Sequence, residues 1–574
     1  MKRQCPPFEL IAIGILAFLA AYVVAAALRP LGIPDEYRYA VIPRAMLNGG
    51  DWVTPRLLGQ LYFEKPVLGY WLIASSEALL GLGALAVRLP MVLATGLTAL
   101  IFAWAARRNY REEVLSTTVL ALYLSGSVLI YFLGVCAVLD SLLALFTSLL
   151  SLMTYAALTT RNGRHRIGYL LIAGVSGGMA FLTKGPIGLI LPGLGILGFI
   201  IWTRRWRDVL RLFWMLPTFL AVVLPWGWAI HRAQPDFWRY FIFVEHIQRF
   251  TAPESGQHQE GWWFFAALLP VMLLPGLLIT IGGSVRLKWR DFRALLRDDM
   301  VRFALASLLL PTIFLSCSGG KLATYLLPTL GFGILLEATV LFEAYRSTPD
   351  YLNKFAAVSL RTVEILLAAS GVGAILVCAF LTASELDYPP GLPQMLCATG
   401  LAGAVGAALL ELNAAAPLRR RLAILLLALG LIAGVGQAFL PPGVAESKFP
   451  ETPVRQLLAQ AGKISRPHYA TTRRYMHVLS YVTGADDISL LESPGELEYA
   501  DRKLREAGKE SFCFKLRELP LLEKRCRQRG ETLVLLYPAK DERLFRFKNP
   551  VSCRYKKGIF QLDVLDFAPP SGKK

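Results

Sequence analysis

Residues 137–157 read AVLDSLLALFTSLLSLMTYAA, and Asp140 is the one charged side chain among them. A helix that crosses the hydrocarbon core of a bilayer needs about 20 mostly apolar residues. The stretch therefore predicts a membrane-spanning helix. Asp140 stands at its start, where a carboxylate is costly unless it is paired or has a function.

Comparable apolar stretches recur up to about residue 440, and they predict an all-α polytopic membrane protein with a soluble tail. Of the 574 residues, 55% are hydrophobic and 18% are charged, against roughly 25% charged in an average soluble domain. We predict thirteen spans, at residues 9–29, 85–106, 114–133, 137–157, 167–183, 187–202, 208–231, 262–283, 300–317, 322–343, 357–381, 394–411 and 421–440.

The first span has an alternative interpretation as a cleaved signal peptide, because Lys2 and Arg3 precede it. Its apolar run is longer than the stretch of about 7–15 residues in such peptides. We therefore expect a retained anchor.

The chain carries 60 Lys and Arg against 41 Asp and Glu, a net charge of +19. Such an excess in a soluble chain would indicate a nucleic-acid partner, but here the cations gather in alternate short loops between spans. Lys and Arg near span ends tend to stay on the cytoplasmic side. The distribution predicts a cytoplasmic N-terminus, an outward-facing tail and no nucleic-acid partner. The loop cations include Arg107, Arg108, Arg111, Arg161, Arg164, Arg166, Arg204, Arg205, Arg207, Arg211, Arg286, Lys288, Arg290, Arg293 and Arg297.

Three segments lie outside the membrane in this topology, namely residues 30–84, 232–261 and 441–574. We expect a membrane domain over residues 1–440 and a separate domain over 441–574. The latter has helix-like stretches near 452–462 and 497–508, and strand-like runs at 532–537 and 560–564. This mixture predicts a small α/β domain.

The first outer segment places two neighbouring carboxylates, Asp35 and Glu36, next to Arg38 where the first span ends. Charges at that depth are costly unless they are used or paired. An interfacial salt bridge of either carboxylate with Arg38 is the simpler interpretation, and a catalytic role is the other. For Asp140, a helix N-cap is the simpler interpretation, and it is compatible with a catalytic one.

Two outer-face lysines, Lys184 and Lys321, depart from the positive-inside pattern. Snorkelling from a helix end would account for either alone. Both, however, stand beside glycines, which allow a backbone to approach a ligand closely. With Lys65 and Arg249, four cations can gather at one membrane surface, and their natural partner is an anionic head group, most simply a phosphate.

The histidines of the second outer segment raise the question of a metal. A zinc site can be assembled from Glu64, His246 and His258 with water in an open position. The spacing is not that of a tight ligand motif, and the alternative is that both histidines form hydrogen bonds in a polar loop.

The run Gly193-Leu194-Gly195-Ile196-Leu197-Gly198 has the letters of a dinucleotide-binding fingerprint. It lies inside an apolar span, without the preceding strand or the following acidic residue that the fingerprint requires. We interpret these glycines as small residues that allow close helix packing.

Several short motifs resemble those of the lipid A aminoarabinose transferases, which are bacterial GT-C membrane glycosyltransferases related to protein O-mannosyltransferases. Their order and spacing over the whole chain are specific, although each motif is short. The motifs are Asp35-Glu36-x-Arg38-Tyr39-Ala40, Tyr62-Phe63-Glu64-Lys65-Pro66, Leu139-Asp140, Thr183-Lys184-Gly185, Val244-Glu245-His246-Ile247-Gln248-Arg249-Phe250, Gly320-Lys321-Leu322-x-Thr324-Tyr325 and, in the tail, Gly495-Glu496-Leu497-Glu498-Tyr499.

The resemblance implies thirteen transmembrane helices, a periplasmic α/β domain and a location in the bacterial inner membrane. It also implies that 4-amino-4-deoxy-L-arabinose passes from undecaprenyl phosphate to a lipid A phosphate at the periplasmic face. This lowers the negative charge of lipid A and weakens the binding of polymyxin and cationic peptides. The expected partners are that donor, lipid A and membrane lipids, the expected state is a monomer, and no cofactor is required, although zinc is possible.

Site roles follow from that reaction, since the leaving lipid phosphate needs hydrogen-bond donors for its growing charge. Asp35 would orient the acceptor or stabilise positive charge at the sugar carbon, as a glycosidase carboxylate does, and Asp140 would hold the sugar ammonium or share that work. The expected phosphate-binding residues are Lys65, Arg249, Tyr325, Tyr62, Arg38, Lys321 and Lys184.

Two other functions stay open. In a protein O-mannosyltransferase-like enzyme, Asp35 would have to accept a proton from a hydroxyl. A transporter would more typically carry its charges near mid-membrane in paired halves.

Overall fold

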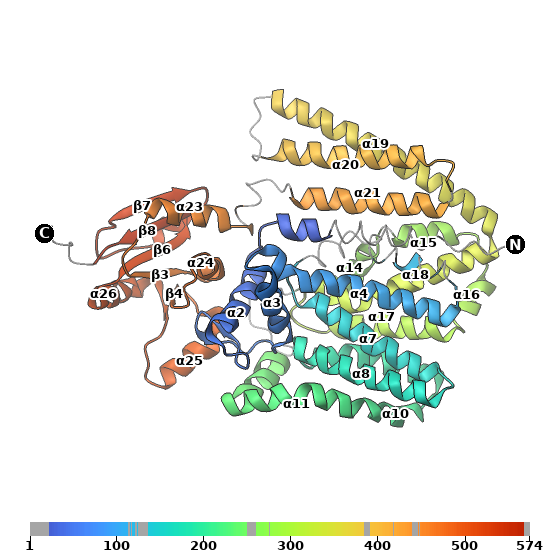
Figure 1. Ribbon diagram of the computed structural model, residues 1–574, viewed down its shortest axis with the longest axis horizontal. Helices are drawn as coiled ribbons and strands as arrows, with labels where there is room; N and C mark the ends of the chain where they lie inside the picture. Colours follow the sequence, from blue (N-terminus) through green and yellow to red (C-terminus); the bar gives the residue numbers. More distant parts are fainter. Residues whose placement is uncertain are drawn as a thin grey trace. The chain divides into compact units, whose positions relative to one another are not determined.

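The computed structural model describes residues 22–112, 136–248, 260–274, 276–383, 391–416, 418–438 and 448–567, together with 115, 118–120, 123 and 446. Its ribbon is drawn in Figure 1. The chain divides into two compact units. The helical unit comprises Met1–Leu28, Lys65–Gly69 and Arg88–Phe439, and the tail unit comprises Arg29–Glu64, Tyr70–Val87 and Leu440–Lys574.

The described part of the helical unit consists of helices. Eight described helical segments are long and apolar enough to cross a membrane. The elements are α4 (Ala84–Tyr110), α7 (Asp140–Thr159), α8 (Gly163–Lys184), α9 (Ile187–Thr203), α10 (Asp208–Arg211), η1 (Leu212–Met215), α11 (Leu216–Ala233), α12 (Phe237–Arg239), η2 (Tyr240–Gln248), α14 (Phe264–Met272), α15 (Gly276–Ser284), α16 (Trp289–Leu295), α17 (Asp299–Ser316), η3 (Ala323–Leu326), α18 (Leu327–Ser347), α19 (Pro349–Ala383), α20 (Leu392–Leu412) and α21 (Leu418–Ala438).

These helices coincide with the predicted spans wherever the structure describes the chain. The prediction of two helices separated by a turn near residue 185 is confirmed by α8 and α9. One difference is the predicted span 262–283, which forms two helices, α14 and α15. The span 114–133 falls mainly outside the described residues, as does most of 9–29, of which residues 22–28 are helical.

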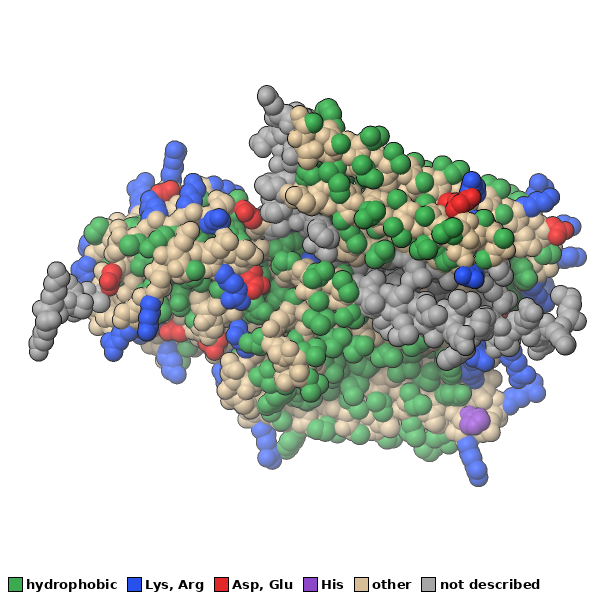
Figure 2. All heavy atoms as spheres, turned by 45° about the horizontal axis from the view of Figure 1, so that its top comes forward, with side chains coloured by type: hydrophobic (Ala, Val, Ile, Leu, Met, Phe, Trp, Pro, Cys, Tyr) green, Lys and Arg blue, Asp and Glu red, His purple; other side chains and the backbone are tan. Residues whose placement is uncertain are grey.

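The outward surface of the helical unit is apolar, as a membrane protein requires. On α19, Leu366, Leu376 and Phe380 are each more than 60% exposed. Figure 2 shows hydrophobic side chains over much of this unit and Lys and Arg side chains gathered at one end of it. Because a soluble protein rarely exposes so large an apolar surface, lipid is its natural environment.

The glycines of α9 confirm the packing interpretation of their sequence. A Cβ atom at Gly195 would lie 2.5 Å from the Ser307 hydroxyl oxygen, and one at Gly198 would lie 2.3 Å from Leu310. Both neighbours belong to α17. The glycines therefore allow α9 and α17 to approach each other closely.

The two ends of the helix bundle differ chemically. At one end, Arg108 near the end of α4 donates to the carbonyl of Ala156 near the end of α7, and Arg205 beyond α9 pairs with Asp299 at the start of α17 at 2.5 Å. At the other end, Asp140 at the start of α7 faces Lys184 at the end of α8. The arginine-rich end corresponds to the loops that the sequence predicts to be cytoplasmic.

The tail unit combines the first outer segment with the C-terminal domain. Its elements are α2 (Asp35–Gly49), β1 (Arg56–Leu57), β2 (Gln60–Leu61), α3 (Leu68–Leu80), α23 (Glu451–Ala461), β3 (Pro467–Thr472), η4 (Arg473–Tyr475), α24 (Met476–Thr483), β4 (Ile488–Leu491), η5 (Gly495–Leu497), α25 (Glu498–Glu506), β5 (Cys513–Phe514), η6 (Leu516–Glu518), α26 (Leu519–Arg529), β6 (Thr532–Pro538), η7 (Ala539–Leu544), β7 (Cys553–Lys557) and β8 (Phe560–Leu565).

A six-stranded sheet of order β5-β4-β3-β6-β8-β7 confirms the predicted α/β domain. Strands β3, β4, β5 and β6 are parallel, whereas β8 pairs antiparallel with β6 and β7. Leu533, Leu535 and Tyr537 of β6 pack with Leu519 and Leu522 of α26. Helices α23 and α24 cover the opposite face (Figure 1), so β6 is buried on both sides, as parallel strands are.

The first outer segment is anchored to this domain inside the tail unit. The Ile33 amide donates to the Lys448 carbonyl at 2.9 Å. The ring of Tyr37 in α2 packs edge-on against Tyr481 at 5.3 Å, and Arg44 donates to the Tyr481 carbonyl at 2.8 Å. The sequence prediction treated this segment as part of the membrane domain, but its contacts group it with the tail.

Candidate active site

A buried ion pair links the ends of two successive helices. Helices α7 and α8 run antiparallel, so Asp140, the first residue of α7, meets Lys184, the last residue of α8. The Lys184 Nζ lies 2.6 Å from the Asp140 carboxylate, with side chains 15% and 7% exposed. The N-cap position of α7 belongs to Leu139, and no side chain caps the helix. The cap interpretation of Asp140 is therefore wrong, because its carboxylate binds Lys184 instead.

Two further predicted site residues contact Lys184. Its ammonium lies 4.6 Å from the ring centroid of Tyr325 in η3, in a cation–π contact. Its carbonyl oxygen lies 3.3 Å from His246 Nε2. Gly185 follows with a φ of +75°, and a Cβ there would lie 2.6 Å from the Phe241 ring. The glycine that the sequence singled out thus accommodates aromatic rings next to the Lys184 backbone.

Lys65 lies in an ion pair of its own. Its Nζ is 2.8 Å from the Glu245 carboxylate, and the two side chains are 15% and 8% exposed. Glu245 and His246 are neighbours in η2, a π-helix, and such helices are frequent at functional sites. Glu245 appeared in the sequence motif without a role. We refer to Asp140, Lys184, Lys65, Glu245 and Tyr325 as the lysine cluster.

His246 is a partly buried side chain whose pKa is lowered. Burial lowers its pKa, and the nearby Lys65 adds to that effect, although its hydrogen bond with the Phe241 carbonyl works in the other direction. The Nδ1–H donates to that carbonyl at 2.7 Å. The alternative that His246 forms hydrogen bonds in its loop is confirmed, whereas His258 and Arg249 lie outside the described residues.

Lys321 is buried and turned towards backbone. Its side chain contacts the Ser318 carbonyl at 2.6 Å and the Glu260 carbonyl at 2.9 Å. These contacts fix the loop that leads to η3 and Tyr325. No described contact joins Lys321 to the lysine cluster.

The tail unit holds a second cluster, which is centred on Arg38 of α2. Arg38 forms ion pairs with Asp35, one turn earlier in α2, and with Glu496 of η5. His477 of α24 completes the group, with its Nε2 2.6 Å from the second Glu496 oxygen. Asp35 is 46% exposed, whereas Arg38, Glu496 and His477 are largely buried. We refer to these four residues as the arginine cluster.

The pKa of Glu496 shows how strongly this cluster favours the carboxylate. Burial alone would raise it, but the charges of Arg38 and His477 outweigh burial and hold the pKa well below the usual range. The Arg38 Nε and His477 Nδ1 atoms are buried without a hydrogen-bond partner. A buried polar atom in that state is uncommon in a native structure.

The sequence predicted a salt bridge of Asp35 or Glu36 with Arg38, and the structure confirms it for one of the two carboxylates. Asp35 does pair with Arg38, but Glu36 does not, because it pairs with buried Arg29 at 3.1 Å and accepts from the Gly32 amide at 2.7 Å. The acidic residues stand in the first turn of α2, where the helix dipole favours negative charge. Of the two carboxylates, Asp35 is therefore the accessible one.

Tyr62 and Glu64, also predicted site residues, bind each other. The Tyr62 hydroxyl donates to the Glu64 carboxylate at 3.0 Å. Burial raises the pKa of Tyr62 well above its usual value, partly offset by Arg38. Tyr62 is therefore a neutral hydrogen-bond donor at any physiological pH.

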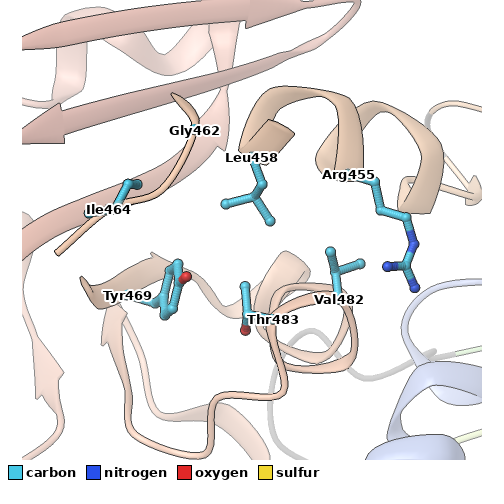
Figure 3. Close-up of a pocket in the computed structure, with 7 residues that line it drawn as sticks. All are labelled: Arg455, Leu458, Gly462, Ile464, Tyr469, Val482 and Thr483. Atoms are coloured by element: carbon cyan, nitrogen blue, oxygen red, sulfur yellow. The ribbon is translucent and has the colours of Figure 1, made fainter. Parts of the chain in front are cut away.

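Two cavities open in the tail unit. One, of about 560 Å³, is lined by Arg38, Glu496 and His477 together with residues that follow β3, β4 and β6. The other, of about 320 Å³, lies between α23 and α24, where Leu458 and Val482 face each other (Figure 3). Its one charged lining residue, Arg455, pairs with Glu451 at 2.8 Å, so the larger cavity is the better candidate for a ligand.

The described residues do not supply a metal site. Among them, no three His, Cys, Asp or Glu side chains lie together in a way that would hold a metal ion. Of the predicted ligands, Glu64 accepts from Tyr62 and both nitrogens of His246 face carbonyl oxygens. No step of the chemistry below is therefore routed through a metal.

Three residues of the two clusters were not predicted from the sequence. Glu245 and Glu496 were present in quoted motifs, and a carboxylate beside expected cations was the available signal. His477 had no signal, because its partner Glu496 lies 19 positions away on another element. Conversely, Arg473 and Arg474 stand in the tail without a described carboxylate partner.

Comparison with known proteins gives consistent results. Residues 12–241 match the family described as dolichyl-phosphate-mannose-protein mannosyltransferase. The chain is 35% identical over 504 residues, 87% of each chain, to the undecaprenyl phosphate-alpha-4-amino-4-deoxy-L-arabinose arabinosyl transferase of Pseudomonas aeruginosa strain LESB58. It is 34% identical over 544 residues to arabinosyl transferase 2 of that name from Sodalis glossinidius, covering 92% of this chain and 93% of the relative.

A solved structure shares the fold. The crystal structure of ArnT from Cupriavidus metallidurans bound to undecaprenyl phosphate superposes with a TM-score of 0.78 and 20% identity, covering 99% of this chain and all of that chain. The apo state of the same protein gives a TM-score of 0.77. The fold of this chain is thus that of a solved protein.

Proposed function

The chain belongs to the undecaprenyl phosphate-aminoarabinose arabinosyl transferases, and from this premise we propose that it moves 4-amino-4-deoxy-L-arabinose from undecaprenyl phosphate to phosphate groups of lipid A. It is a lipid-linked-sugar-dependent glycosyltransferase with a GT-C fold. The observation that carries the proposal is 35% identity to a named transferase over 87% of both chains. The two charge clusters, which bring together most of the charged residues that the sequence predicted for the site, support it independently.

The transfer exchanges one phosphate ester for another. An acceptor phosphate oxygen attacks the anomeric carbon, the bond from that carbon to the donor phosphate breaks, and undecaprenyl phosphate leaves with the electron pair. The acceptor is already anionic at neutral pH, so no strong general base is needed. The chain must therefore bind two anions, orient them and stabilise positive charge at the sugar carbon.

The lysine cluster is suited to bind the donor phosphate. Lys65 and Lys184 each face a carboxylate, so a phosphate that enters would share or replace these ion pairs. We assign Lys65, Lys184 and Tyr325 to this phosphate, with Arg249 and Lys321 as further donors. Preorganised donors of this kind stabilise a leaving group as its charge develops.

The two carboxylates that the sequence selected take the remaining roles. Asp35, the exposed member of the arginine cluster, orients the acceptor or stabilises the developing positive charge. Asp140 holds the sugar ammonium or shares that task. Arg38 fixes Asp35 by a direct ion pair. Tyr62 would donate its hydroxyl to the donor phosphate in place of its bond to Glu64.

We further propose thirteen spans in the inner membrane, with the N-terminus in the cytoplasm and the tail in the periplasm. The arginine-rich end of the helix bundle supports this orientation, because such residues tend to stay cytoplasmic. The lysine cluster lies at the opposite end, where the lipid-linked donor would be used. We propose a monomer as the working state.

A zinc ion held by Glu64, His246 and His258 is a separate hypothesis from the sequence. Metal analysis of the purified chain tests it, since stoichiometric zinc would be lost in a His258→Ala variant. The transfer proposed above does not depend on the outcome.

Cells that lack their own aminoarabinose transferase but make its donor provide the test. We expect this chain to restore polymyxin resistance, because the added amino sugar lowers the negative charge of lipid A. The Asp35→Asn chain, expressed to the same level, is the control and should leave the cells sensitive.

The match of residues 12–241 to protein mannosyltransferases makes a protein hydroxyl the second candidate acceptor. Resistance that stays absent with the intact chain, together with new sugar on membrane or periplasmic proteins, would favour that acceptor over lipid A.

A further inference from the structure

The larger cavity of the tail unit has the position of a ligand site. Its volume of about 560 Å³ falls in the usual range for small-molecule pockets. It contains room for more than a single phosphate. The lining residues are Ile33, Pro34, Arg38, Lys448, Thr472, Arg473, Arg474, Tyr475, His477, Glu492, Glu496, Pro538, Lys540 and Asp541.

Sheet topology places this cavity where open α/β sheets bind their ligands. The chain passes from β3 outward to β4 and β5 on one side, and then returns to place β6 on the other side of β3. The neighbours β3 and β6 therefore form a topological switch point. Arg473 directly follows β3, Glu492 follows β4 and Lys540 follows β6, so the cavity lies at the carboxyl ends of these parallel strands. Ligands of this class of sheet bind there as a rule.

The charges of the cavity favour an anion. Apart from His477, five cationic and three carboxylate side chains line it, an excess of two cations. One of the carboxylates, Glu496, is already neutralised by Arg38 and His477. Among the described residues, no carboxylate lies within ion-pair distance of Lys448, Arg473, Arg474 or Lys540.

A buried nitrogen atom of His477 also indicates that the cavity holds a ligand. The His477 side chain is 1% exposed and lines the cavity, and its Nδ1 atom has no hydrogen-bond partner. The Nε atom of Arg38, another lining residue, is also without one. Buried polar atoms in this state are usually completed by a water molecule or a ligand.

The two other carboxylates of the cavity indicate that its ligand carries hydroxyl or amino groups as well as phosphate. Glu492 and Asp541 line the cavity without a described cationic partner. Carboxylates are acceptors for hydroxyl and amino groups, whereas arginines and lysines bind phosphate oxygens. A ligand that carries both kinds of group, such as a phosphorylated sugar, matches this combination.

We propose that this cavity binds the phosphorylated sugar head group of the acceptor lipid. Arg473, Arg474, Lys448 and Lys540 contact its phosphate oxygens, and Glu492 and Asp541 contact its sugar. The inference rests on the proposed function for the identity of the lipid. Arg38 links the cavity to the chemistry, because it lines the cavity and also binds Asp35.

Binding of a soluble head group to the purified full-length chain tests this proposal without requiring turnover. The probe is the phosphorylated disaccharide left after lipid A is deacylated, and its dephosphorylated form is the ligand control. We expect the double variant Arg473→Glu with Lys540→Glu to bind the probe at least 10-fold more weakly than the wild type. Both residues are exposed, so the change should not disturb folding.

The matched control is Lys556→Glu with Lys557→Glu on strand β7, which changes the net charge equally at exposed positions away from the cavity. It should bind the probe within 2-fold of the wild type. If the glutamate pair at the cavity lowers the unfolding temperature, the neutral pair Arg473→Gln with Lys540→Gln replaces it, with a loss of about 5-fold expected.

Equal affinity of the cavity variant and the wild type would overturn the proposal. So would inorganic phosphate that displaces the probe at the probe's own concentration, because the site would then be a simple anion site. Failure of the proposed function is seen separately, as absent sugar transfer by the wild type, and leaves the binding result interpretable.

Discussion

At the residue scale, variants of Asp140 and Lys184 show whether this buried ion pair stabilises the fold, takes part in sugar transfer, or does both. Removing one partner of a buried pair leaves an uncompensated charge and costs about 3–5 kcal/mol. We expect Asp140→Asn to lower the stability of the purified protein by about that amount. Thermal unfolding in detergent, compared with the wild type, measures the change.

The double variant Asp140→Asn with Lys184→Met separates the two roles, because it removes both charges. It should recover much of the lost stability while sugar transfer stays absent. Transfer at the wild-type rate by the double variant would show that the pair only supports the fold.

Glu496 gives a prediction with a defined pH dependence. Its folded pKa lies below the unfolded value of about 4.3, so its stabilising contribution is present above that value and is lost as the pH falls. We expect Glu496→Gln to destabilise the protein by about 3 kcal/mol at pH 7, since Arg38 loses a buried partner.

Unfolding measured at pH 7 and at pH 4 tests this sign. The difference between wild type and Glu496→Gln should shrink on acidification, because the carboxylate begins to take up a proton in the unfolded chain, where its pKa is about 4.3, while it stays charged in the folded protein. A difference that grows at pH 4 would show that Arg38 and His477 do not hold this carboxylate charged.

The sequence predicted individual site residues better than their partners. The sequence identified Asp35, Asp140, Lys65 and Lys184, because a charge at a membrane surface is costly unless it is paired or has a function. The pairing of Asp35 with Arg38, three positions away, was predictable, but the partner of Lys65 was not. Lys65 and Glu245 are 180 positions apart, and only the packing of helices brings them together. Arg38 and Glu496 are separated even further, by 458 positions.

At the scale of elements, the contact between α9 and α17 depends on glycine. A Cβ at Gly195 would lie 2.8 Å from the Ser307 Cα, whereas one at Gly193 would meet nothing within 4 Å. Gly195→Ala should therefore cost about 1–3 kcal/mol through overpacking. Gly193→Ala in the same helix is the matched control and should be neutral or gain about 0.5–1 kcal/mol.

Thermal unfolding of both variants checks this prediction. Equal unfolding temperatures for the two variants would mean that the helices can separate without cost, which would contradict the close packing.

Element prediction succeeded where the local signal was strong. The apolar spans and the strands β6 and β8 have long hydrophobic runs, and the structure confirms them. Strands β3 and β4 were missed because β3 reads PHYATT, with proline and alanine, and β4 has only four residues. Both become strands because parallel neighbours complete their hydrogen bonds, a tertiary effect that a local pattern does not contain.

At the scale of the whole molecule, the orientation of the chain in the membrane is open to a direct test. Cys553 of the tail is exposed. If the tail is periplasmic, a membrane-impermeant maleimide added to intact spheroplasts should label it. Cys317, which is also exposed, is replaced by Ser in every chain tested. The Cys553→Ser variant in that background is the control and should lose the label. Labelling that appears only after lysis would place the tail in the cytoplasm.

The most direct test of the account uses purified components. The full-length chain, reconstituted in lipid, receives isotopically labelled undecaprenyl phosphate-aminoarabinose and lipid A, and mass spectrometry follows the label. We predict that labelled sugar appears on lipid A phosphate as undecaprenyl phosphate is released, and that Asp35→Asn lowers the rate at least 100-fold. Lipid A that stays unlabelled with folded protein, or an Asp35→Asn chain as fast as the wild type, would contradict the account.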